Sequence, residues 1–224
     1  IFGPLPLVNG LLHKVQYVAL KYYGGIDSIV VSVNDRGFSG PDGAKQATMT
    51  VAVVIEPTND PPSILTSFGV LTFSENTNTR VEGVTVHDAD AGEDFRSLLT
   101  VNLTVSHGKL SFLGIPGLFM NEHPQANGQN VLSLQGGLAR LNSALGNLKY
   151  KGKKEWHGKD ILLIMVSDNG NTGSGGAKFA SANVTFIVEP LDNAPVLSCP
   201  LEQMSLEDTP LLVDFISLHD ADAP

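Results

Sequence analysis

The sequence predicts an all-β chain of tandem antiparallel β-sandwiches joined by short Pro-rich linkers. The first observation is a repeated segment: VHDADAG begins at Val86, and LHDADAP begins far downstream at Leu218. The second is the alternation of branched apolar residues in short runs bounded by Gly, Pro, Asn and Asp, which is typical of strands. The third is the composition, because 23 Gly and 13 Pro in 224 residues supply many turns.

The rest of the chain repeats with these segments. Val30–Pro62 aligns without a gap with Leu163–Pro195, so that Asp35 falls on Asp168 and GAK falls on GAK. A fixed offset between matching stretches indicates a repeated structural unit. We expect three units, which are the C-terminal part of a first repeat (1–60), a complete second repeat (61–193) and the N-terminal part of a third (194–224). We expect the chain to belong to a longer array of such units.

The strands within a unit follow from the apolar runs. TMTVAVVIE, LLTVNLTVS, DILLIMVSD and ANVTFIVE each alternate or stay apolar over several residues. In GGLARLNSALGNL, leucines recur at helical spacing, which predicts one short helix per repeat, leading into a strand at 149–151. The segments TNDPPS and LDNAPV cannot lie inside a central strand because proline lacks the N–H that a ladder needs, so they predict stiff linkers.

Composition also restricts the function. The net charge of −9 argues against binding nucleic acid, which needs a basic surface. A single cysteine, Cys199, excludes an internal disulfide and a Cys-based zinc site; we expect it to be a buried apolar residue or to pair outside this segment. No nucleophile elbow, HExxH, P-loop or Rossmann glycine pattern occurs, so we expect no enzymatic activity.

Acidic and amide side chains gather where one unit meets the next. Asp88 and Asp90 stand two residues apart in a loop, and Asp168 lies in the turn VSDNG. The linkers carry Asn59-Asp60 in one copy and Asp192-Asn193 in the other. Carboxylates and amide carbonyls are hard oxygen ligands of the kind that Ca²⁺ requires. The alternative is that these carboxylates are solvated loop residues.

The order of these motifs resembles a known family. DAD, then DNG, then a D/N-rich linker ending in Pro is similar to cadherin and cadherin-like repeats. Two segments further resemble the long cadherin-like or immunoglobulin-like repeats of large surface proteins. They are DADAGEDFRSLLTVNLTVSHGKLSF and VSDNGNTGSGGAKFASANVTFIVEPLDNAPVL. Such proteins include type I-secreted adhesins and, more distantly, chondroitin sulfate proteoglycans. This resemblance implies Greek-key sandwiches that hold Ca²⁺ at their junctions.

Carried over position by position, the resemblance implies two sets of Ca²⁺ ligands. The first junction would use Asn59, Asp60, Asp88, Asp90 and Asp168. The second would use Glu75, Asp192, Asn193, Asp220 and Asp222. The linkers depart from the family pattern, because EPTNDPP and EPLDNAP lack its first Asp and first Asn. Fewer ligands leave two alternatives, a single ion at each junction or a direct packing contact without an ion.

The function that we expect is a non-catalytic, extracellular or cell-surface structural or adhesive array, in which Ca²⁺ stiffens a rod or filament shaft. Its partners would be further repeats of the chain or neighbouring copies in a fibre. The sequons at Asn102 and Asn183 would carry glycans if the two side chains face outward. The alternative is a ligand- or glycan-binding surface module, for which the long loop 113–129 would be the contact. We expect Trp156 to pack a corner of the sandwich rather than to bind substrate.

Overall fold

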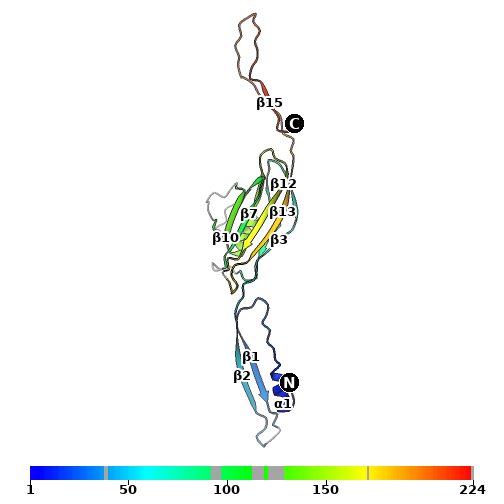
Figure 1. Ribbon diagram of the computed structural model, residues 1–224, viewed down its shortest axis with the longest axis vertical. Helices are drawn as coiled ribbons and strands as arrows, with labels where there is room; N and C mark the ends of the chain where they lie inside the picture. Colours follow the sequence, from blue (N-terminus) through cyan, green and yellow to red (C-terminus); the bar gives the residue numbers. More distant parts are fainter. Residues whose placement is uncertain (38–39, 92–96, 113–118, 121–128, 171, 223–224) are drawn as a thin grey trace.

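The computed structural model describes residues 1–37, 40–91, 97–112, 119–120, 129–170 and 172–222. Figure 1 shows an elongated molecule, with a two-stranded sheet near the N-terminus, a sandwich in the middle and a second two-stranded sheet near the C-terminus. The helices are α1 (Leu5–Leu12) and α2 (Leu138–Leu145). The strands are β1 (Gly25–Asn34), β2 (Gln46–Ile55), β3 (Ser63–Thr66), β4 (Val70–Ser74), β5 (Asn78–Arg80), β6 (Val84–His87), β7 (Leu99–Thr104), β8 (Gly108–Ser111), β9 (Phe119–Met120), β10 (Val131–Gly136), β11 (Lys149–Gly152), β12 (Gly158–Ser167), β13 (Phe179–Glu189), β14 (Val196–Ser198) and β15 (Ser217–His219).

The main layer of the sandwich is a six-stranded sheet in the order β4-β13-β12-β7-β10-β9. Its central strands have the alternation that the sequence predicts, since β12 has the burial pattern of a strand with one inner and one outer face. Leu162, Ile164 and Val166 are buried, whereas Leu163 and Met165 between them are exposed. The apolar runs are therefore confirmed as strands, and β7, β12 and β13 each place one face in the core.

One pairing in this sheet is not antiparallel. Strand β4 pairs with β13 in parallel, with Leu71 opposite Phe186 and Phe73 opposite Val188. The chain leaves the small β3–β6 sheet after Thr66 and enters the main sheet at Val70. Because β4 and β13 lie at opposite ends of the unit's sequence, the whole unit forms the long connection that a parallel pair requires. The expectation of a purely antiparallel sandwich was wrong at this edge.

The second layer consists of the sheets β5-β11-β8 and β3-β6 together with helix α2. The helix buries Leu141, Ala144 and Leu145 against the core, as its leucine spacing predicts. The Asn142 side chain accepts a hydrogen bond from Val86 N (2.8 Å) and donates one to Val86 O (2.9 Å), which attaches the helix to strand β6. The predicted helix and the strand after it are both confirmed.

An aromatic cluster joins the two layers. Tyr150 lies with its ring centroid 5.3 Å from Phe73 and 4.6 Å from Phe186, and it is almost fully buried. Its hydroxyl donates to Asp160 Oδ2 (2.9 Å). The same buried carboxylate accepts hydrogen bonds from the backbone N–H groups of Ser106 and His107. Burial and the neighbouring carboxylate raise the pKa of Tyr150, so it stays a neutral donor.

The repeat of the sequence is present in the structure. Helices α1 and α2 begin at Leu5 and Leu138, and strands β1 and β12 begin at Gly25 and Gly158, so both pairs are separated by the same offset. The positive φ angles recur at that offset too, for example 58° at both Arg36 and Asn169. The sequence repeat therefore corresponds to a repeat of local structure.

The two outer sheets lack a covering layer in the described part of the chain. No residue of β1 or β2 is buried, although a few are half-buried, and β14 and β15 are exposed. Cys199 follows β14 and is exposed, so the expectation that it is buried was wrong, because no second sheet packs over it here. In the described residues, neither helix has the length and apolar character needed to cross a membrane.

Removing the Tyr150 hydroxyl should destabilise the middle unit. Tyr150→Phe leaves the buried Asp160 without one of its donors, which we expect to cost about 1–2 kcal/mol. The matched control is Tyr17→Phe, because Tyr17 OH also donates to a carboxylate, Asp27 Oδ2 (2.7 Å), but both groups are exposed. We expect this control to cost less than about 0.5 kcal/mol. Chemical unfolding followed by the fluorescence of Trp156 measures both, and equal costs would contradict this role for the Tyr150 hydroxyl.

Candidate functional site

The first linker lies against the loop between β12 and β13. Asn59 N–H donates to Ser174 O (2.8 Å), and Ser174 N–H donates to Pro57 O (2.9 Å). These two bonds form an isolated parallel bridge between Thr58 and Ser174. The linker is therefore held by the main chain of the unit that follows it.

Asn59 is the most buried polar residue of this junction, with 1% of its surface exposed. Its side-chain amide donates to Asp168 Oδ2 (2.7 Å) and to Gly176 O (2.8 Å). Its side-chain oxygen accepts a hydrogen bond from the Thr172 hydroxyl (3.1 Å). Both predicted ligands, Asn59 and Asp168, are thus brought together, but an amide N–H group lies between them.

The DAD segment forms a turn that is tied to the linker. Asp88 Oδ1 accepts hydrogen bonds from Asp90 N (2.8 Å) and Ala91 N (3.0 Å). The second carboxylate accepts a hydrogen bond from the linker, since Asp60 N–H donates to Asp90 Oδ2. Both aspartates of the DAD segment thus bond to main-chain N–H groups, one within the turn and one in the linker.

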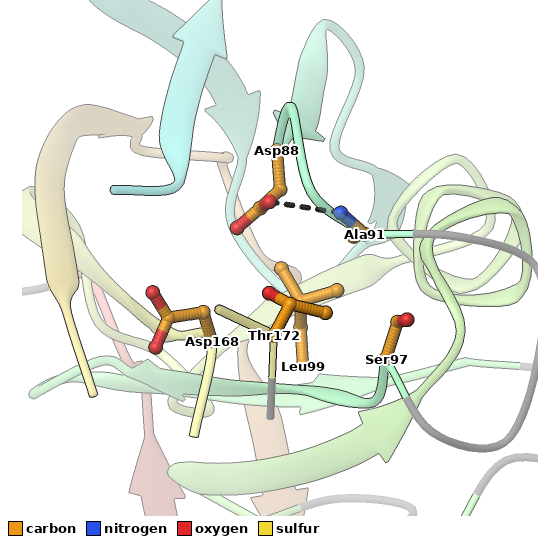
Figure 2. Close-up of a pocket in the computed structure, with 6 residues that line it drawn as sticks. All are labelled: Asp88, Ala91, Ser97, Leu99, Asp168 and Thr172. Carbon is orange, nitrogen blue, oxygen red and sulfur yellow. Dashed lines mark hydrogen bonds between the residues drawn. The ribbon is translucent and has the colours of Figure 1, made fainter. Parts of the chain in front are cut away.

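The other oxygen of Asp88 has no partner in the described part of the chain. Asp88 is 4% exposed, and its Oδ2 is buried without a hydrogen bond there. Figure 2 shows the carboxylates of Asp88 and Asp168 on the wall of one small pocket, whose other lining residues are Ala91, Ser97, Leu99 and Thr172. A buried carboxylate oxygen without a donor carries a desolvation cost, so this pocket is where a cation would be favourable.

The pKa of Asp88 also indicates that a cation would be favourable in this pocket. Burial raises the pKa of Asp88 above its ordinary value of 3.8, and the negative charges of Asp90 and Asp168 raise it further. The N–H groups of Asp90 and Ala91 oppose this shift. The folded chain therefore disfavours the charged form of Asp88 unless positive charge is supplied.

The second junction repeats part of this network. Asp222 N–H donates to Asp220 Oδ1 (2.9 Å), and Asn193 N–H donates to Asp222 Oδ2. The Asn193 amide also reaches Glu75 Oε1 (2.9 Å), and Glu75 is 1% exposed. Asp192 is exposed. Four of the five residues predicted for this junction are thus connected, and the same turn and linker bond occur in both copies of DAD.

The donor set partly fits a calcium ion. All the predicted ligands at the first junction offer oxygen, and Asp88 Oδ2 has no competing hydrogen bond among the described residues. In the same part of the chain, however, no three acidic, His or Cys side chains are close enough to form a metal cluster by themselves. A protein cation is also present, because the Lys178 ammonium donates to Asn59 O. The fit therefore rests on the pocket between Asp88 and Asp168.

Sequence reasoning missed the residues of the β12–β13 loop. Lys178, Thr172 and Ser174 all contact the linker, although none was assigned a role. The repeated GAK was the available signal, because it places a lysine after each D-x-G turn. The group that Lys178 contacts is the backbone carbonyl of Asn59, and every residue has such a carbonyl, so the sequence does not identify it.

The remaining sequence predictions concern the surface. Asn102 and Asn183 are both exposed on the outer face of the main sheet, on the strands that flank β12. Loop 113–129 lies mostly outside the described residues. Trp156 packs against the core and stacks on His107, with ring centroids 4.5 Å apart, which supports the packing role expected for it.

No protein-family profile matches the chain, and no curated protein matches it in sequence. Solved structures that are similar to it include the following three. Human CDH23 EC21-23 is 19% identical, with 89% of this chain and 59% of that chain covered and a TM-score of 0.41. The protocadherin GammaB4 extracellular domain is 16% identical, with 89% and 29% covered and a TM-score of 0.36. Mouse clustered PcdhgC3 EC1-3 is 20% identical, with 91% and 57% covered and a TM-score of 0.33.

The chain is thus similar to cadherin extracellular repeats along about nine-tenths of its length, at low sequence identity. It spans less than two thirds of the length of each of these structures.

The raised pKa of Asp88 predicts a pH-dependent stability difference. Because the folded-state pKa lies above the ordinary 3.8, ionised Asp88 costs stability at neutral pH, and the cost vanishes as pH falls through the folded pKa toward 3.8. Asp88→Asn keeps the Oδ1 acceptor and removes the charge. In metal-free buffer we expect this variant to be more stable than the wild type near pH 7, with a gap that closes by about pH 4.

Unfolding free energies of both chains across this pH range measure the gap. Asp42→Asn is the control, because Asp42 is an exposed carboxylate. The control should differ from the wild type by an amount that hardly changes with pH. A gap for Asp88→Asn that widens as pH falls would contradict the assignment.

Proposed function

We propose that the chain is a non-catalytic segment of an extracellular or cell-surface rod, built from repeated β-units and stiffened at their junctions. In this proposal residues 1–60, 61–193 and 194–224 belong to three successive units, and the neighbours of each unit are its main partners. The observation that carries the proposal is the first linker, in which Asn59 is buried and hydrogen-bonded to the unit that follows. A flexible tether between independent modules would leave its backbone in water.

The repetition of local structure supports an array. A helix, a pair of long strands and the DAD turn each occur twice, and the second copy of each lies at nearly the same offset from the first. Units that contact only their neighbours add length in proportion to their number. Length together with stiff joints suits a spacer, shaft or adhesive stalk better than it suits a catalyst.

Calcium at the junctions is part of the proposal. At the first junction Asp88 and Asp168 would hold the ion, with Asp90, Asp60 and Asn59 around them. At the second, the corresponding residues are Glu75, Asp192, Asn193, Asp220 and Asp222. A bound Ca²⁺ supplies positive charge to these carboxylates. The support is the buried Oδ2 of Asp88, which has no hydrogen-bond partner among the described residues.

Calcium should stabilise the wild type modestly and Asp88→Asn by less, because this variant loses the first site and keeps the second. Extracellular modules bind Ca²⁺ with Kd of roughly 10⁻⁴ to 10⁻³ M. At about 1 mM Ca²⁺ this adds about 0.4–1.4 kcal/mol per site to the free energy of unfolding. Chemical unfolding of both chains and of the Asp42→Asn control, with Ca²⁺ and with chelator, measures the increment. Equal increments in the wild type and Asp88→Asn would show that Asp88 is not a Ca²⁺ ligand.

Stiffening has its own readout. We expect the solution scattering of the chain to indicate a more extended and less variable molecule with Ca²⁺ than with chelator. Superimposable profiles would rule out stiffening by Ca²⁺ while leaving the repeat array intact.

Both sequons should accept glycans when a eukaryotic host secretes the chain. The Asn102 and Asn183 side chains are exposed and point away from the core, so a glycan adds no packing conflict. Intact mass before and after N-glycosidase treatment measures occupancy. Thr104→Ala and Thr185→Ala destroy one sequon each and leave the asparagine in place, so each should remove one glycan. A secreted chain with the mass of its bare sequence would refute this.

A further inference from the structure

The loop between β12 and β13 contacts the first linker through both main-chain and side-chain groups. It runs from Asp168 to Lys178, and both ends are fixed, since Asp168 Oδ1 accepts hydrogen bonds from Gly170 N (2.9 Å) and Lys178 N (2.8 Å). Its middle forms the main-chain bridge to the linker through Ser174. The loop is therefore shaped by its own carboxylate and presents main-chain groups outward.

Gly173 lets the two backbones approach closely. It has a φ of +68°, and a Cβ placed there would lie 2.6 Å from Asn59 N and 2.7 Å from the carbonyl carbon of Thr58. Both neighbours are backbone atoms, so they cannot rotate away as a side chain can. A side chain at position 173 is incompatible with the bridge.

The Asn59 side chain is matched to the loop in its donors and acceptors. Its NH₂ group faces two acceptors, the Asp168 carboxylate and the Gly176 carbonyl, and its oxygen faces the Thr172 hydroxyl. An aspartate at this position could not donate, and its charge would lie against Asp168. The loop therefore selects asparagine at this position of the linker.

Lys178 supplies the positive charge of the contact. Its ammonium donates to the Asn59 carbonyl, while its backbone N–H holds Asp168. The same residue thus connects the linker carbonyl to the loop carboxylate. This arrangement places one positively charged group in the acidic junction without an ion from solution.

The linker is also packed against the first unit. A Cβ at Gly24, directly before β1, would lie 2.6 Å from Pro57 Cβ, so the Pro57 ring rests on the Gly24 backbone. Pro57 O accepts the Ser174 hydrogen bond on the other side. One rigid residue is therefore in contact with both units.

We propose that the β12–β13 loop is a recognition surface for an extended Pro-Xaa-Asn segment, here the chain's own linker, and that it locks the first junction without a metal ion. This goes beyond the proposed function, in which stiffness comes from Ca²⁺. The corresponding loop of the first unit has the same local form, with Gly40 and Gly43 at positive φ and Asp35 holding Lys45 N (2.8 Å). Among the described residues other than its chain neighbours, none has an atom within 4 Å of a Cβ added at Gly40. The loop is thus preorganised by its own sequence rather than by the linker.

The repeat supplies a matched test. Spin labels at Thr50→Cys on β2 and Ser181→Cys on β13, both exposed positions, report the distance across the junction in a Cys199→Ser background. In chelator we expect one narrow distance peak for the otherwise wild-type chain. Gly173→Ala should lose that peak. Gly40→Ala should keep it, although it bears a comparable backbone strain at positive φ.

A broad distribution for the unsubstituted chain in chelator would overturn the proposal, and so would equal widths for the two glycine variants. If Gly173→Ala fails to fold by Trp156 fluorescence, Lys178→Met and Lys45→Met form the second pair. Lys178→Met should lose the narrow peak and Lys45→Met should keep it; equal widths overturn the lock. All arms are measured in chelator, so they are decided independently of whether Ca²⁺ binds.

Discussion

The contact on which the junction depends is the one between the Asn59 amide and the Asp168 carboxylate. It joins residues 109 positions apart, and both are buried. A buried hydrogen bond to a charged acceptor is costly to break, because it leaves the carboxylate short of a donor in a region that excludes water. Moving the linker off the loop therefore means breaking this buried hydrogen bond. In the proposed rod, this hydrogen bond would fix the path of the linker against the loop.

Hydrogen bonds between carboxylates and the linker also explain why a DAD segment occurs at each junction. The first aspartate accepts the N–H of the second and shapes the turn, and the second accepts an N–H of the linker. Short acidic side chains suit this task because they hydrogen-bond to nearby backbone groups. The turn needs only one oxygen of its first aspartate. The other oxygen of Asp88 is buried and accepts no hydrogen bond from the described residues. A cation in the pocket would therefore be favourable.

Much of the fold could be predicted because it follows from short-range patterns. The alternation along β12 and the leucine spacing of α2 each depend on one face meeting a core, so the sequence alone reveals them. The parallel β4–β13 pair could not be predicted, since it joins the two ends of a unit and no local pattern encodes a partner. The candidate site, too, could be predicted only in part. The acidic residues were visible as motifs, whereas the contact of Lys178 with a linker carbonyl depends on how the two units are placed.

The two linkers resolve the same excess of negative charge differently. In the first, Asn59 donates to the acidic loop and Lys178 adds a permanent positive charge. In the second, the residue aligned with Asn59 is Asp192, which can only accept, and the next residue, Asn193, donates its amide to Glu75 Oε1 (2.9 Å). The cationic group nearest to that junction's buried Glu75 among the described ion pairs is His157, 3.7 Å from Oε2, and an imidazole is charged only when protonated. Both linker amides therefore donate to a buried carboxylate of the middle unit, Asn59 to Asp168 and Asn193 to Glu75.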